Sequence, residues 1–140
     1  LDILGIKKVV IALNKIDPAR AGVIQTDVFS AITDSYDYIF ANPPYIDQAK
    51  AGTVQDSVLF HEPHDALFAK EGGLYFIKKL LAEGGKHLKA SGMMYIEFGA
   101  GQKTAIAELA RGAGWKTEFH KDQFGKWRSV KVFHRHAIDK

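Results

Sequence analysis

The chain has no cysteine and no long apolar stretch, and each absence excludes a class of protein. Without cysteine, neither a disulfide framework nor a thiolate metal site is possible. No run of about 18 consecutive apolar residues occurs, so we expect no membrane span. The first residues, "LDILGIKKVV", also lack the cleavage pattern of a signal peptide. These absences favour a cytoplasmic location.

The charge and the length set further bounds. The net charge is only +3, which permits a nucleic-acid partner without demanding one. A chain of 140 residues with 46% hydrophobic residues is long enough for one domain with a core, and too short for two comfortable ones.

Apolar residues recur at helical spacing in three segments, which we expect to form α-helices. The first covers residues 5–16 and stops near Asp17 and Pro18. The second begins at Leu74 and weakens at the Gly84-Gly85 pair, and the third covers residues 103–112.

Strand patterns alternate with these helices. The expected strands are residues 22–27, 36–41 and 93–98, followed by 115–120 and 129–134 as an antiparallel hairpin. Residues 46–73 show little periodicity, which suggests a functional loop or lid. This order predicts an α/β fold with a mostly parallel sheet. Ligands bind such sheets beyond the carboxyl ends of the strands, where Asp27, Asn42 and Glu97 fall.

The stretch "NPPY", Asn42 to Tyr45, ends the strand over residues 36–41. Two prolines remove two backbone donors and fix two φ angles, so neither a sheet ladder nor a helix continues through them. Asn42 precedes a proline and is held in an extended conformation. Taken alone, this pattern is most simply a rigid turn.

In its context, "NPPY" resembles the substrate motif of class I S-adenosylmethionine-dependent amino-methyltransferases. These enzymes act on the planar nitrogens of adenine, cytosine or glutamine, which are poor nucleophiles because the lone pair is delocalised. The resemblance implies that the Asn42 side-chain carbonyl and the Pro43 backbone carbonyl accept the two hydrogens of that nitrogen. Pro44 keeps the backbone rigid, and Tyr45 covers the planar face of the substrate.

Three further motifs resemble the protein-(glutamine-N5) methyltransferases of the HemK/PrmC type, which modify the Gly-Gly-Gln glutamine of peptide chain release factors. "FHEPHDALFAKEGGL" resembles the segment that follows NPPY in that family. "IEFGAGQ" resembles its Glu-x-Gly-x-x-Gln motif, and "KDQFGKWRSV" its Lys-Asp-x-x-Gly-x-x-Arg motif. Four ordered motifs with matching gaps imply this activity, with a release factor as the partner.

The resemblance also implies S-adenosyl-L-methionine as cofactor, bound by Asp2 at the ribose, Asp27 near the adenine, and Asn42. The family's glycine loop, first strand and N-terminal helical domain have no counterpart in the sequence. Residues 1–140 are therefore expected to be a partial catalytic domain with a Rossmann-like methyltransferase sheet that lacks its first strand. We expect this part alone to bind the cofactor weakly or not at all.

Several alternatives stay open. A ribosomal-protein glutamine methyltransferase shares NPPY, as does an adenine-directed nucleic-acid methyltransferase, although the small basic excess disfavours the latter. The alternative to an enzyme is that the chain is an inert fragment or a protein-binding module. Glu97 either neighbours the ligands or caps the next loop, and Gln102 is a simple helix cap. We expect no metal site, since His61, Glu62, His64 and Asp65 match a family loop.

Overall fold

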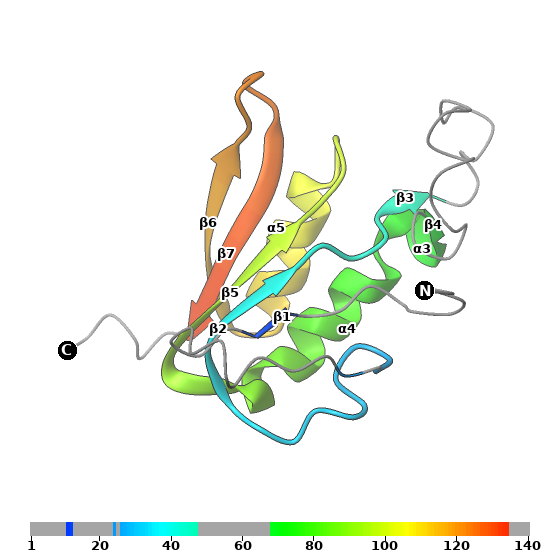
Figure 1. The fold of residues 1–140 in the computed structure, drawn as a ribbon. Helices are drawn as coiled ribbons and strands as arrows, with labels where there is room; N and C mark the ends of the chain where they lie inside the picture. Colours follow the sequence, from blue (N-terminus) through cyan, green and yellow to red (C-terminus); the bar gives the residue numbers. More distant parts are fainter. Residues whose placement is uncertain (1–10, 13–23, 25, 48–67, 135–140) are drawn as a thin grey trace.

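The computed structural model describes residues 11–12, 24, 26–47 and 68–134. A five-stranded sheet lies at the centre of this part, in the order β1-β2-β5-β7-β6 (Figure 1). Its strands are β1 (Ile11–Ala12), β2 (Tyr36–Ala41), β5 (Leu88–Glu97), β6 (Trp115–Lys121) and β7 (Trp127–His134).

The sheet is mixed. β2 and β5 run parallel, whereas β7 pairs antiparallel with both β5 and β6. The predicted C-terminal hairpin is therefore confirmed. Where the sequence predicted a mostly parallel sheet, the five-stranded sheet contains one parallel pairing among its described strands, because β7 returns beside β5 and β1 runs against β2.

β1 lies within the segment that was predicted to be a helix. Ile11 and Ala12 pair antiparallel with Phe40 and Ile39 of β2, so the helix prediction is wrong at these two residues. The rest of residues 5–16 lies outside the described ranges. The outer edge of β2 offers backbone N–H and C=O groups to an extended segment, and this pairing outweighs the local apolar spacing.

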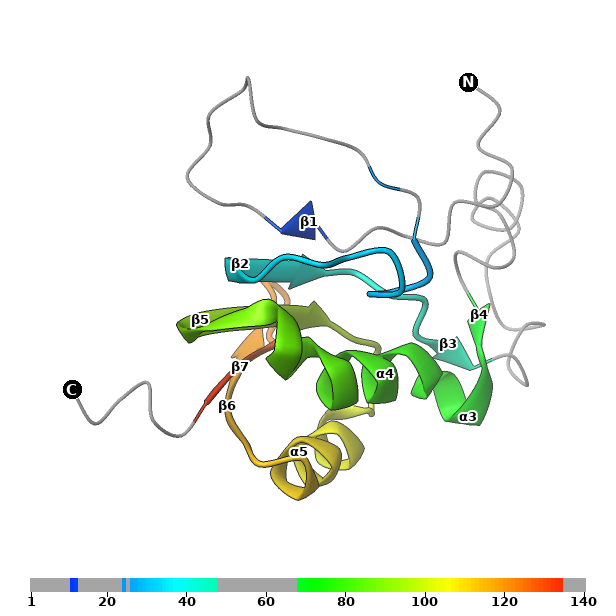
Figure 2. The same ribbon diagram turned by 90° about the horizontal axis from the view of Figure 1, so that it is seen from below.

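Two helices cover one face of the sheet, as Figure 2 shows. They are α4 (Tyr75–Glu83), followed by the 3₁₀ turn η3 (Gly84–His87), and α5 (Lys103–Gly112). Both confirm the sequence prediction, and α4 ends where the glycine pair begins. Side chains from both layers are fully buried between them: Ile39, Met94, Ile96, Val130 and Val132 from the sheet, and Ile77, Leu80 and Ile106 from the helices.

The core also contains one satisfied polar contact. Trp115 is 7% exposed, and its indole N–H donates a hydrogen bond of 2.8 Å to the carbonyl oxygen of Leu81 at the end of α4. A buried indole without an acceptor is costly, so this bond fixes how β6 packs against α4.

A second, two-stranded sheet joins the ends of the segment over residues 46–73. β3 (Ile46–Asp47) pairs parallel with β4 (Phe68–Ala69), and residues 48–67 lie outside the described ranges. α3 (Lys70–Gly73) follows, with left-handed φ angles of 57° at Glu71, 66° at Gly72 and 82° at Gly73. This turn leads the chain into α4. Within the described ranges, no helix is long and apolar enough to span a membrane.

Candidate functional site

The loop from Asn42 to Tyr45, called the NPPY loop below, begins where β2 ends. β2 pairs in parallel with β5, and Ala41 lies opposite Ile96. Asn42 and Glu97 therefore stand at the same edge of the sheet, at the carboxyl ends of two neighbouring parallel strands. This is the edge at which open α/β sheets bind ligands.

The first residues of the NPPY loop differ in their exposure. Pro43 and Pro44 are buried, whereas Asn42 is exposed. Among the residues that the structure describes, none hydrogen-bonds to the Asn42 side chain. The prolines fix the backbone on which this amide stands. Within the part of the chain that the structure describes, the donor and acceptor groups of the Asn42 amide therefore have no protein partner.

Tyr45, at the other end of the loop, is partly buried and held by a carboxylate. Its hydroxyl donates a hydrogen bond of 3.1 Å to Oε1 of Glu97. Burial raises the pKa of the Tyr45 phenol above its usual 10.0, the charge of Glu97 and this hydrogen bond raise it further, and the nearby Arg128 opposes them. Tyr45 therefore remains a neutral donor at physiological pH.

Gln102 joins three loops at this edge. Its side-chain amide N–H group donates hydrogen bonds of 2.9 Å to the carbonyl oxygens of Tyr45 and Gly72. Its side-chain carbonyl accepts one of 2.8 Å from the backbone N–H of Gly99. Gln102 occupies the N-cap position of α5, but its side chain makes no capping bond there. The expected cap position is therefore confirmed, but the Gln102 side chain bonds to neighbouring segments instead of capping the helix.

Two glycines allow other chain segments to approach Tyr45 closely. A Cβ atom on Gly73 would lie 2.0 Å from the Tyr45 carbonyl oxygen, and one on Gly99 would lie 2.9 Å from Cδ2 of the Tyr45 ring. Neither contact is sterically possible without movement. The predicted family motifs contain both glycines, and the structure gives a physical reason for each.

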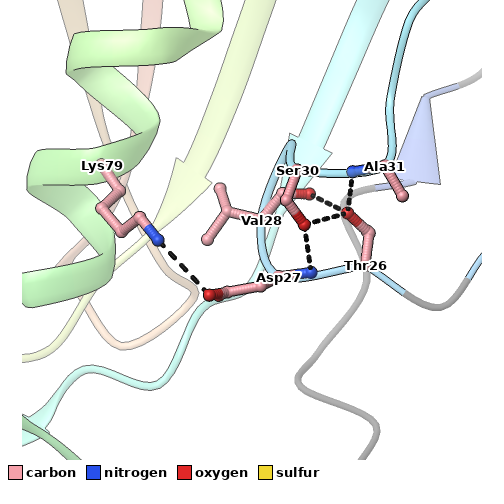
Figure 3. A network of polar contacts seen from close by, with 6 residues as sticks. All are labelled: Thr26, Asp27, Val28, Ser30, Ala31 and Lys79. Carbon is pink, nitrogen blue, oxygen red and sulfur yellow. Dashed lines mark hydrogen bonds and ion pairs between the residues drawn. The ribbon is translucent and has the colours of Figure 1, made fainter.

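Asp27 lies in a turn that packs toward α4 (Figure 3). Its backbone N–H donates to Ser30 Oγ at 3.1 Å, and its half-exposed carboxylate is 3.5 Å from Nζ of Lys79. The prediction of a strand over residues 22–27 is wrong at the described residues, which form a loop and turn. Thr26 explains the difference, since its Oγ1 accepts the N–H of Ala31 at 3.0 Å and closes the turn.

The remaining predicted positions are not described. Asp2 and the His61, Glu62, His64 and Asp65 group lie outside the described ranges. Within those ranges, no cluster of three or more His, Cys, Asp or Glu residues is arranged to bind a metal ion.

The chain is similar in sequence to known proteins. A release factor glutamine methyltransferase from Streptococcus pneumoniae is 39% identical over 110 residues, which are 77% of this chain and 39% of that protein. The enzyme of the same name from Lactococcus lactis subsp. lactis is 36% identical over 120 residues, 84% of this chain and 44% of that protein. The chain belongs to the release factor glutamine methyltransferase family.

The structural comparison supports the fold assignment. A methyltransferase from Pyrococcus furiosus superposes with a TM-score of 0.52 at 22% identity, over 77% of this chain and 45% of that one. The Rossmann-like α/β class is therefore confirmed. No family model matches the sequence. The chain spans about two fifths of the length of the two curated relatives, at 39% and 44%.

The sequence placed Glu97 at the ligand-binding edge and Gln102 at the start of a helix, but did not indicate their contacts with Tyr45. The signal was present in "IEFGAGQ", where the two side chains are five positions apart on either side of a glycine turn. Their partners, however, are distant in the sequence. Tyr45 is 52 residues from Glu97 and 57 from Gln102, so the contacts depend on the folded sheet.

Proposed function

We propose that the protein carrying this chain transfers a methyl group from S-adenosyl-L-methionine to the side-chain amide nitrogen of glutamine in the Gly-Gly-Gln motif of peptide chain release factors. The observation that carries the proposal is the exposed side-chain amide of Asn42, which has no hydrogen-bond partner among the described residues. Two buried prolines, Pro43 and Pro44, follow Asn42 and fix the backbone beside it. The names of the curated relatives support the choice of substrate. A cytoplasmic location accords with that substrate.

The chemistry follows from the acceptor nitrogen. The lone pair of an amide nitrogen is delocalised, so the nitrogen gains nucleophilicity when both of its hydrogens are bound by acceptors. Asn42 Oδ1 and the Pro43 carbonyl would accept these two hydrogens and fix the direction of the lone pair. Both acceptors are neutral oxygens on a rigid backbone, and they stabilise the positive charge that develops on nitrogen.

Tyr45 would supply a planar contact for the substrate amide. Its phenol stays protonated because burial and Glu97 raise its pKa. Tyr45 thus serves as a contact surface and not as a base. No strong base is needed before transfer, because the nitrogen loses its proton only after it has gained positive charge.

The donor set accords with an adenosyl cofactor. The Asp27 carboxylate is half-exposed and would accept a hydrogen bond from an adenine amino group, and Asn42 would stand between cofactor and substrate. Asp2, the proposed ribose ligand, lies outside the described ranges. S-adenosyl-L-methionine, when bound, supplies an electrophilic methyl group on a sulfonium centre.

The proposal is tested by mass spectrometry on the full-length protein. It is incubated with S-adenosyl-L-methionine and, in separate reactions, with a release factor, a mixture of ribosomal proteins, or DNA. Methylation of the release factor glutamine is the expected result. Methylation confined to a ribosomal protein would indicate a ribosomal-protein glutamine methyltransferase, and methylation confined to adenine in DNA a nucleic-acid methyltransferase. No methylation in any reaction would support an inert or protein-binding role.

A further inference from the structure

Tyr45 contacts residues on three sides that take no part in the proposed chemistry. Glu97 accepts the hydrogen bond from its hydroxyl, Gln102 donates to its carbonyl oxygen, and Gly73 and Gly99 pack against its backbone and ring. Glu97 is the last residue of β5 and Gln102 immediately precedes α5, so the two residues stand at the two ends of one connection. One connection therefore holds both ends of the Tyr45 residue, its hydroxyl and its backbone.

The hydrogen bonds of Gln102 fix the NPPY loop to two other segments. Its amide nitrogen uses both hydrogens, one for Tyr45 and one for Gly72 in the turn before α4. Its carbonyl oxygen takes the Gly99 N–H. Only a primary amide donates twice and accepts once in this way, so neither glutamate nor leucine would replace it.

The link between Tyr45 and Asn42 is short and stiff. Only Pro43 and Pro44 separate them, and each has its φ angle fixed by its ring. A rotation of the backbone at Tyr45 is therefore transmitted to Asn42 with little loss. Because Asn42 makes no hydrogen bond of its own to a described residue, its position depends on this connection.

We propose that Glu97 and Gln102 are positioning residues that hold Tyr45, and through the two prolines hold the Asn42 and Pro43 acceptors, in the geometry that methyl transfer requires. Glu97 fixes the ring and Gln102 fixes the backbone. Neither touches the reacting atoms. This inference rests on the proposed function for its catalytic consequence, whereas the restraint on Tyr45 is a structural claim that stands by itself.

The first test is a kinetic cycle in the full-length protein with a release factor as substrate. Glu97→Ala and Tyr45→Phe each remove one side of the same hydrogen bond, and each should lower kcat about tenfold. The double variant should fall no further than the lower single variant, and the affinity for S-adenosyl-L-methionine should stay unchanged. Glu97→Gln keeps an acceptor oxygen and should recover most of the loss. Losses that multiply in the double variant would overturn the role of Glu97.

A second pair of variants separates the two functions of Gln102. Gln102→Glu keeps the acceptor for the Gly99 N–H but loses both donors, whereas Gln102→Ala loses all three bonds. If the donors hold the NPPY loop, both variants should lower kcat by about ten- to a hundredfold, and Gln102→Glu by at least as much as Gln102→Ala, because a carboxylate oxygen would face two carbonyl oxygens. Wild-type kcat in Gln102→Glu would overturn the proposal for this residue. Gly112→Ala is the control, because an added Cβ there meets nothing within 4 Å.

A spectroscopic measurement tests the restraint without activity. The protein is labelled with fluorotyrosine, and the Tyr45 fluorine signal is assigned by its loss in Tyr45→Phe. The signal should shift and narrow in Glu97→Ala and in Gln102→Ala, because the ring gains freedom, and should be unchanged in Gly112→Ala. If the signal responds while the wild-type protein methylates no substrate, the proposed function fails and the restraint stands. An unchanged signal in both variants would overturn the restraint itself.

Discussion

The two ends of the NPPY loop contrast in how they are held. At one end, Asn42 is exposed and its side chain hydrogen-bonds to no residue that the structure describes. At the other end, Tyr45 is partly buried and hydrogen-bonded through both its hydroxyl and its carbonyl oxygen. Only two buried prolines lie between them.

The residue that is restrained, Tyr45, is therefore not the residue whose side chain is left for a ligand, Asn42. An amide that already has protein partners would have to give them up before it bound a substrate, and an amide on a loose loop would rarely stand in the right place. In the proposed mechanism the loop avoids both problems, because the restraints act on Tyr45 and the acceptor is Asn42. Such preorganisation is how polar groups contribute most to a transition state.

The largest effect on activity should come from Asn42, the open end of the NPPY loop. Asn42→Ala should slow methyl transfer by roughly 3 kcal/mol of transition-state stabilisation, as for the loss of one preorganised polar contact. Its free energy of unfolding should change by less than about 0.5 kcal/mol, because the side chain is exposed. Single-turnover kinetics and urea unfolding measure the two quantities.

Gln123→Ala is the matched control, since it removes another exposed side-chain amide, in the loop between β6 and β7. It should leave both quantities unchanged. Full activity in Asn42→Ala would remove the open end from the mechanism, and a large loss of stability would show that Asn42 is a structural residue.

The largest effect on stability should come from the packing around Tyr45, the restrained end of the NPPY loop. Gly72 and Gly73 both have positive φ, so alanine at either position costs about 1–2 kcal/mol through the backbone. At Gly73 the new Cβ would also stand 2.0 Å from the Tyr45 carbonyl oxygen, whereas at Gly72 it meets nothing within 4 Å. Gly73→Ala should therefore cost about 1–3 kcal/mol more than Gly72→Ala. Equal unfolding free energies for the two variants would mean that the turn does not pack against Tyr45.

A smaller effect should appear in the titration of Tyr45. Glu97→Gln should lower the pKa of the phenol, because it removes a neighbouring negative charge, but burial should keep this pKa above 10.0. In the wild-type protein Tyr45 ionises first in the unfolded state, so the contribution of Tyr45 to stability is constant well below pH 10.0 and is lost as the pH rises through the raised pKa. The phenolate absorbance of each protein minus that of its Tyr45→Phe counterpart measures the shift. An unchanged or higher pKa in Glu97→Gln would contradict the contact.

The smallest effect should come from the pair between Asp27 and Lys79, away from either end of the loop. The two charges are 3.5 Å apart, and the side chains are 47% and 28% exposed. Lys79→Ala should change the free energy of unfolding by less than about 1 kcal/mol, which denaturant titration resolves. A larger loss would indicate that the turn around Asp27 is part of the folding core.

The elements around the site differ in how far the sequence predicted them. α5 was predicted at its observed bounds, since its apolar spacing is complete and glycines flank both of its ends. The hairpin of β6 and β7 was predicted by alternation over two adjacent runs. In each case the decisive pattern is local, so it was visible in the sequence.

Predictions failed where side chains or distant strands decide the conformation. Ile11 and Ala12 follow a helical pattern but pair with the edge of β2. Thr26 lies in a β-rich run, yet its hydroxyl closes a turn with Ala31. For the site, the sequence indicated Asn42 and its neighbours through the family motif. The two carbonyl groups to which the Gln102 amide donates, however, are 30 and 57 residues away and come close only in the folded chain.

The central claim is that the open end of the NPPY loop serves methyl transfer to a glutamine side chain. The most direct test is fragment mass spectrometry of a release factor after incubation with the full-length protein and S-adenosyl-L-methionine. We predict one added methyl group on the side-chain amide of the Gly-Gly-Gln glutamine, and roughly a hundredfold less product at the same early time with the Asn42→Ala variant. A methyl group on a different residue, or equal labelling by the variant, would contradict the account.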